Sequence, residues 1–131
     1  MKPSLRKITA VLPVAAIEPS LPFWEAVGLT RTVEVPHGDA LGFVILAGRD
    51  LEVMLQTHAS IADDMPALAD AARKGPTFLF IEVDDIDAIE QALAGRELAF
   101  PRRTTFYGAT EVGYREPGGH YVTFAQFPPG E

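Results

Sequence analysis

The sequence predicts an α+β fold made of two tandem βαβββ modules. The predicted order of elements, which is a strand, a helix and three further strands, occurs twice along the 131 residues. A constant offset of 69 residues superimposes the halves, since it takes Leu12 onto Ile81 in the first strands and Val53 onto Val122 in the last. The length suits one compact domain with a core of its own. We therefore expect a single domain over residues 1–131 with an internal duplication.

Module one is expected over about residues 5–57. Apolar residues at every second position from Ile8 to Val14 indicate its first strand. A helix should run from about Pro19, which suits a first helical position, to Val27. Three strands should follow, at residues 29–35, 41–47 and 51–57.

Residues 58–76 form the expected connector, and module two follows over about 77–127. In the connector, Asp64 is expected to cap a helix that ends at Arg73-Lys74-Gly75. In module two, Asp85 should cap a helix that runs to Ala94. The remaining elements are strands at 78–83, 98–101, 111–116 and 120–127, with a long turn at 102–108.

Charge and composition exclude several classes of function. The net charge is −7, with 18 acidic and 11 basic residues, which opposes binding to phosphate backbones. Because the chain has no cysteine, it has no disulfide, thiolate metal site or cysteine nucleophile. No apolar run is long enough to span a membrane, and early prolines make a signal peptide unfavourable. We expect a cytoplasmic protein that binds neither nucleic acid nor membrane.

Two segments carry a resemblance to a known family. The opening segment combines Leu12-Pro13-Val14 with Ile17, Leu21, Phe23-Trp24 and Gly28-Leu29. The closing segment is more specific, with Gly108, then EVGYREPGGH at 111–120 and VTFAQ at 122–126. The chain resembles the glyoxalase/bleomycin-resistance/dioxygenase (vicinal oxygen chelate) superfamily, and looks like a metal-free, bleomycin-resistance-like member. It departs from the usual closing turn at Glu116 and Gly118, because the family commonly has Asp at both positions.

Enzymes of this superfamily hold a divalent ion with four side chains, from the first and last strand of each module. The resemblance places these positions at Thr9, Met54, Phe78 and Thr123. None of the four side chains is a competent ligand for a borderline or hard divalent ion. The histidines are expected in a turn or at strand ends, at positions 37, 58 and 120. We therefore expect no metal and no cofactor.

The resemblance also implies curved mixed sheets around a concave cavity that holds the ligand. Aromatic side chains there could stack on a planar molecule, while a lone carboxylate would attract a cation. The same aromatic residues are equally compatible with a role in the core. The candidate ligand-binding residues are Trp24, Glu52, Met54, Gln56, Phe78, Phe80, Tyr107 and Tyr121.

The expected function is binding of a small molecule, such as sequestration of a planar or cationic antibiotic-like ligand, by a homodimer without metal. No residue is assigned a catalytic role on this hypothesis. Two alternatives stay open. One is a metal-dependent lyase, isomerase or dioxygenase of the same superfamily, and the other is a metal-free enzyme that uses Glu52 or Tyr121 as acid or base.

Overall fold

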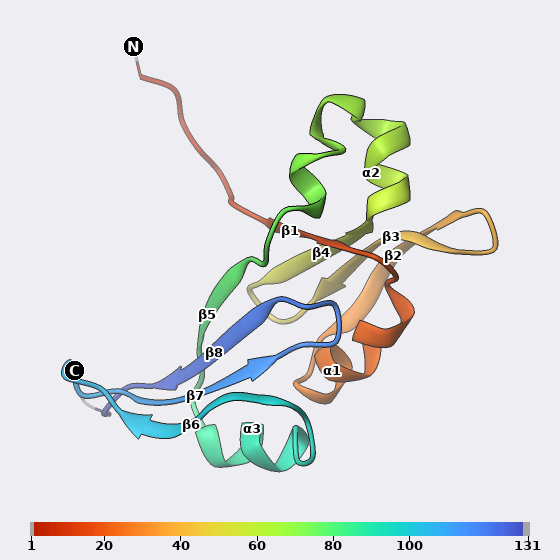
Figure 1. The fold of residues 1–131 in the computed structure, drawn as a ribbon. Helices are drawn as coiled ribbons and strands as arrows, with labels where there is room; N and C mark the ends of the chain where they lie inside the picture. Colours follow the sequence, from red (N-terminus) through yellow and green to blue (C-terminus); the bar gives the residue numbers. More distant parts are fainter. Residues whose placement is uncertain (1, 130–131) are drawn as a thin grey trace.

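The computed structural model describes residues 2–129 and contains two four-stranded mixed sheets, one from each half of the chain (Figure 1). Sheet A has the strand order β1-β4-β3-β2, and sheet B has the order β5-β8-β7-β6. Module one contains β1 (Ala10–Val14), η1 (Glu18–Ser20), α1 (Leu21–Ala26), β2 (Thr30–His37), β3 (Ala40–Ala47) and β4 (Glu52–Thr57). Module two contains β5 (Phe78–Glu82), α3 (Ile86–Ala92), β6 (Leu98–Thr104), β7 (Thr110–Arg115) and β8 (Tyr121–Gln126).

The register of the parallel strand pairs confirms the two-module α+β fold. In sheet A, Val11 of β1 lies opposite Met54 of β4. In sheet B, Phe80 of β5 lies opposite Thr123 of β8. The 69-residue offset takes the first pair onto the second, so the repeat seen in the sequence is a repeat of backbone pairing. No hydrogen-bonded strand pair joins the two sheets in the described chain.

The connector differs from the prediction. Its α-helix, α2 (His58–Asp64), ends at Asp64 rather than beginning there, and only two 3₁₀ turns follow, η2 (Pro66–Leu68) and η3 (Ala71–Arg73). The N-cap is Thr57, whose hydroxyl accepts a hydrogen bond from the Ser60 amide at 3.1 Å. Met65 leaves the helical region with φ −135° and ψ 73°, as the residue before a proline tends to do. The proline therefore terminates the α-helix and begins a 3₁₀ turn instead of a second α-helix.

Two strand boundaries also differ from the prediction. The first strand begins at Ala10, and Ile8 is 90% exposed, because residues before Ala10 have no neighbouring strand to pair with. The sixth strand runs on to Thr104, so the expected turn at 102–108 starts only at Thr105. The cap at Asp85 is confirmed, since its carboxylate accepts a hydrogen bond from the Ala88 amide.

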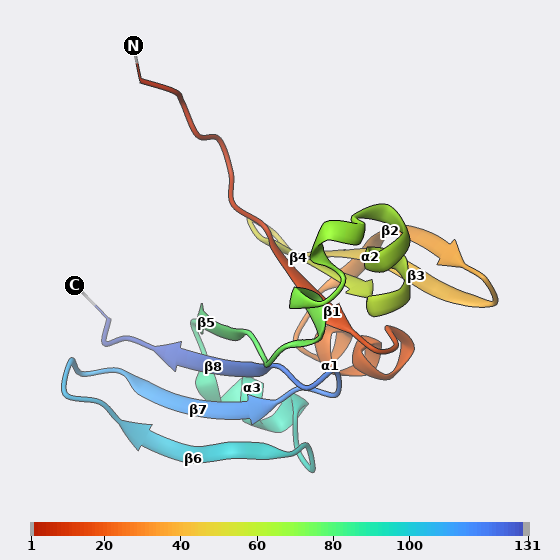
Figure 2. The same cartoon turned by 45° about the horizontal axis from the view of Figure 1, so that its top comes forward.

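One hydrophobic core spans both modules. The inward side chains of the two sheets pack with α1, and the ring of Phe23 lies 6.3 Å from that of Tyr114 on β7. A buried histidine adds a polar link, because His120 Nε2 lies 2.6 Å from the carbonyl oxygen of Pro13 in module one. The modules lie side by side around this core, as Figures 1 and 2 show.

The β7–β8 turn explains the unusual glycine in the closing segment. A Cβ atom at Gly118 would lie 2.6 Å from Val14 Cγ1 and 2.6 Å from Glu116 Oε1. The Glu116 carboxylate is fully buried and accepts a hydrogen bond from the His120 amide at 3.1 Å. Since the turn packs this closely on β1, a side chain at position 118 has no room.

None of the described helices is long and apolar enough to cross a membrane.

Candidate functional site

Each sheet has an inner face that packs into the core and an outer face that does not. On β5 and β8, inward side chains alternate with outward ones, as the two-residue period of a strand requires. The outer face of sheet B is aromatic. Phe78 is 76% exposed, Phe80 is 54% exposed, and the Phe78 ring meets that of Tyr121 edge to face at 5.9 Å.

The β6–β7 loop adds a further aromatic residue to this face. The ring of Tyr107 stacks on Phe127 at 5.9 Å, and Phe127 meets Phe80 edge to face at 6.4 Å. We call Phe78, Phe80, Tyr107, Tyr121 and Phe127 the aromatic face. Three of the four predicted aromatic residues of module two thus share one strand pair, and the fourth reaches them from a loop.

A buried carboxylate that sequence reasoning missed lies beside the aromatic face. Glu111 on β7 is 1% exposed and lies opposite Ala125 of β8. Its carboxylate accepts hydrogen bonds from Arg103 Nε at 3.2 Å and Nη2 at 3.0 Å, and from the Tyr107 hydroxyl. The hydrogen bond to Glu111 is the main cause that raises the pKa of Tyr107, with burial adding to it. Tyr107 therefore holds the loop as a neutral donor.

The outer face of sheet A is mainly aliphatic, with Phe43 of β3 as a half-buried aromatic residue, and it is partly covered by the connector. Val11, Pro13 and Gln56 line a groove of about 420 Å³ together with side chains of the connector, including the buried Ile61 of α2. Gln56 is 6% exposed, and its Nε2 donates to Ser60 Oγ at 3.0 Å. Met54, which is half-buried, lies on the same outer face.

Glu52 lies at the start of β4 with partners from its own chain. Lys7 Nζ lies 2.9 Å from its carboxylate, and Thr9 Oγ1 donates to the carboxylate at 2.9 Å. The hydrogen bond from Lys7, followed by that from Thr9, holds the pKa of Glu52 below its ordinary value. A carboxylate held in its ionised form is a weak proton acceptor, which disfavours Glu52 as a general base.

The four positions that correspond to the superfamily's metal ligands do not form a donor set. The hydroxyl of Thr9 is bonded to Glu52, and the Phe78 ring extends into solvent. Within residues 2–129, no three or more His, Asp or Glu side chains lie close enough together to hold an ion. The residues at these positions therefore do not fit a divalent metal.

Two of the three histidines have structural partners. His120 Nδ1 accepts a hydrogen bond from the Thr77 amide at 2.9 Å, so its Nε2 carries the proton that is donated to Pro13. His37 pairs with Asp63 at 2.7 Å. Burial, and then the charge of Arg73, lowers the pKa of His58. Within residues 2–129, none of the three belongs to a group of three or more side chains that could hold a metal ion.

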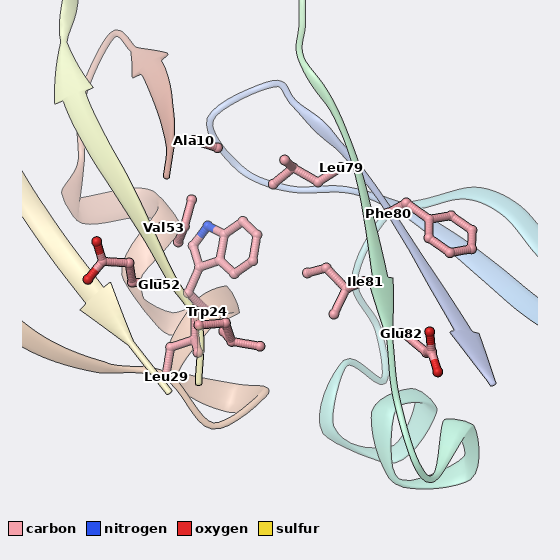
Figure 3. Close-up of a pocket in the computed structure, with 10 residues that line it drawn as sticks. Ala10, Trp24, Leu29, Glu52, Val53, Leu79, Phe80, Ile81 and Glu82 are labelled. Atoms are coloured by element: carbon pink, nitrogen blue, oxygen red, sulfur yellow. The ribbon is translucent and has the colours of Figure 1, made fainter. Parts of the chain in front are cut away.

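Trp24 lies apart from both outer faces. It is 1% exposed, and its ring lines a cleft of about 350 Å³ between β1, β4 and β5 (Figure 3). Leu79 and Ile81 face it across the cleft, whereas the side chains of Glu52 and Phe80 extend away from it. The eight predicted residues are thus divided among the aromatic face, the outer face of sheet A and this cleft.

No protein-family profile matches the chain, and no curated protein matches it. Solved structures do match. A glyoxalase/bleomycin resistance protein/dioxygenase from Nocardioides is 18% identical with a TM-score of 0.74, and the match covers 99% of this chain and 89% of that one. The protein has the glyoxalase/bleomycin-resistance/dioxygenase fold.

Two other structures with this fold have different functional names. The bleomycin resistance determinant encoded on transposon Tn5 is 15% identical with a TM-score of 0.67, and the match covers 94% of this chain and 98% of that one. A lactoylglutathione lyase from Agrobacterium tumefaciens is 16% identical with a TM-score of 0.72, with coverage of 95% and 96%. The fold therefore occurs both in a protein named for antibiotic resistance and in one named as a lyase, and function must be argued from the site.

Proposed function

We propose that the protein binds a planar, cationic small molecule on its aromatic face without metal, and that it sequesters an antibiotic-like compound. The observation that carries this proposal is the exposure of Phe78 and Phe80 next to a half-buried Tyr121. Exposed rings held on a rigid sheet can stack on a flat ligand with little loss of conformational entropy. The fold likeness to a bleomycin resistance determinant supports the same class of function.

The charge beside the aromatic face favours a cation. Glu82 follows Phe78 and Phe80 along β5 with the same side-chain direction, and Figure 3 shows the side chains of Phe80 and Glu82 on the same side of the strand. No ion pair involving Glu82 occurs within residues 2–129. A ligand cation stacked on Phe80 would therefore meet both the ring and a carboxylate without a competing basic side chain.

We further propose that a second copy of the chain completes the site. The outer faces expose several large apolar side chains, namely Val11, Val33, Val35, Phe78 and Phe80. Apolar patches of more than a few hundred Å² are uncommon on monomers, and twofold pairing is the commonest way to cover them. Sedimentation at tens of micromolar should show a dimer. A monomer would contradict this part of the proposal.

A thermal-shift screen against planar amines and matched neutral compounds tests the binding proposal. A compound that binds only the folded state at a hundred times its Kd stabilises it by about 2.7 kcal/mol. Cationic compounds should give the larger shifts. Glu82→Gln should weaken binding of a cationic hit about two- to fivefold, as for an exposed ion pair. Asp39→Asn, in the β2–β3 turn, is the matched control and should leave the affinity unchanged.

Metal analysis tests the competing metal-dependent functions. Protein purified without chelators and then dialysed should contain well below one equivalent of zinc, nickel, manganese or iron, because the four expected positions lack ligands. A stoichiometric ion would favour the metal-dependent lyase, isomerase or dioxygenase instead.

A further inference from the structure

The cleft between the sheets has walls from both modules. Ala10 and Val53 of sheet A line one side, and Leu79 and Ile81 of β5 line the other (Figure 3). Its volume is about 350 Å³, and an adjoining hollow of about 150 Å³ shares Trp24 and Ile81 with it. Since β1 and β5 share no hydrogen bonds, this space separates the two sheet edges at the boundary of the core.

Trp24 gives the cleft an aromatic wall with an unused donor. The indole is fixed by an edge-to-face contact with Phe23 at 5.2 Å. Figure 3 shows its six-membered ring toward β5 and its nitrogen on the side of Ala10 and Val53. The buried Nε1 has no hydrogen-bond partner within the described chain. An unpaired buried donor is costly, and Nε1 is shielded from solvent. A small rotation of the indole toward the cleft would let a ligand acceptor reach it and gain a hydrogen bond that the protein does not supply.

The charges around the cleft restrict what can enter. Glu52 and Glu82 contribute to its lining, but their carboxylates extend away from it, and no basic side chain lines it. A ligand carboxylate would have to lose its hydration without an ionic partner and next to two acids. A ligand ammonium would find those carboxylates on the outer side of the strands rather than in the cleft.

We propose that this cleft is a second ligand site, separate from the aromatic face, which takes an uncharged aromatic or alicyclic molecule with one hydrogen-bond acceptor. The volume lies at the lower end of the range for ligand pockets. It accommodates about a dozen non-hydrogen atoms if each occupies roughly the 30 Å³ of a liquid water molecule. The apolar body contacts Leu79 and Ile81, and the acceptor lies toward the indole nitrogen.

The chain contains a single tryptophan, so its emission reports directly on the cleft. Three probes with the same phenyl body distinguish the ligand classes: 4-phenylbutan-2-one, 4-phenylbutylamine and 4-phenylbutyrate. The ketone should change Trp24 emission in a saturable way and bind at least about tenfold more tightly than the carboxylate. The amine should bind more weakly than the ketone, because its charge has no partner inside the cleft.

Two cleft-filling variants and one control variant locate the binding. Ala10→Leu fills the cleft and should abolish the ketone response, and Leu79→Phe, on the opposite wall, should do the same if the first variant fails to fold. Phe78→Ser, on the aromatic face, should leave it unchanged. Circular dichroism verifies the fold of each variant.

Several results would overturn the proposal: no saturable response, a response that survives a folded cleft-filling variant, or loss of the response in Phe78→Ser. A change of Trp24 emission on dilution without probe, together with no probe response, would mean that a second copy occupies the cleft. None of these outcomes depends on Glu82→Gln or on the amine screen, so failure here is separable from failure of the proposed function.

Discussion

Sheets A and B share strand order and parallel-pair register, yet their outer faces have different chemistry. Sheet A presents mainly aliphatic side chains, with Phe43 as a half-buried aromatic residue, and is partly covered by α2, which buries Gln56 against Ser60. Sheet B is aromatic and open, with Glu111 buried between Arg103 and Tyr107. The repeat therefore specifies the backbone and the core but not the surface that meets a ligand. Binding is expected to be asymmetric between the two modules.

The comparison between sheets A and B assumes that the two modules share one core and unfold together. Leu55 and Phe124 occupy equivalent positions under the 69-residue offset, and both are buried in the shared core. Leu55→Ala should lower the free energy of unfolding by about 2–5 kcal/mol and Phe124→Ala by about 3–5 kcal/mol. Urea unfolding followed by Trp24 emission and by circular dichroism should give one coincident transition in each variant. Two separate transitions would show that each module folds alone.

A second equivalent pair tests the asymmetry of binding. Phe80 and Val11 are related by the same offset and lie on the two outer faces. With a hit from the amine screen, Phe80→Ala should weaken binding by roughly 1–3 kcal/mol if its ring stacks on the ligand. Val11→Ala should leave the affinity within experimental error. Equal effects, or none at Phe80, would remove the functional distinction between the faces.

Removing the N-cap of α2 tests how much this helix, which covers part of sheet A, contributes to the stability of the fold. Thr57→Ala removes the side-chain hydrogen bond to the Ser60 amide and should lower the free energy of unfolding by about 1 kcal/mol. Asp85→Ala, at the cap of α3, is the matched variant in module two. If the urea midpoint moves only for Asp85→Ala, α2 contributes little to the stability of the fold.

The smallest expected effect concerns the loop over sheet B. The Tyr107 hydrogen bond to Glu111 favours the neutral phenol, so it is present below the ordinary phenol pKa and is lost as the pH rises through the raised pKa of Tyr107. In Glu111→Gln this pKa should move down toward its ordinary value, as followed by tyrosinate absorbance. The raised pKa of Tyr114, which comes mainly from burial, should stay in place. An unchanged titration would mean that Tyr107 does not depend on Glu111.

Structural features that come from strand alternation or from the internal duplication could be predicted from the sequence. Alternation along β1 and β8 identified the inward residues Leu12, Val122 and Phe124, and the offset predicted that the two halves superpose, which the equivalent registers of the two parallel pairs confirm. The connector was harder, because Asp64 and Thr57 are both good capping residues and the choice depends on where β4 ends. The preference of each residue type for the N-cap position could not decide between Asp64 and Thr57.

Only part of the candidate site could be predicted from strand alternation and the duplication. Phe78, Phe80 and Tyr121 follow from strand alternation, which places them on one face. Trp24 does not, because the direction of a short helix relative to two sheets is set by tertiary packing. Glu111 was missed since its burial depends on Arg103 and Tyr107, which reach it from β6 and from the loop. The available signal was an acidic residue on the same face as Gly113, in a strand otherwise rich in buried residues.

The absence of strand pairing between the sheets leaves β1, β2, β5 and β6 as outer strands in the described chain. Three of them contain proline, at Pro13, Pro36 and Pro101, which interrupts the hydrogen-bonding edge. The fourth, β5, reads Phe-Leu-Phe-Ile-Glu, with neither proline nor a basic residue. Short, apolar strands of this composition promote cross-β aggregation when they are exposed. During refolding, or in variants that loosen module two, β5 is therefore the segment at which aggregation is expected to begin.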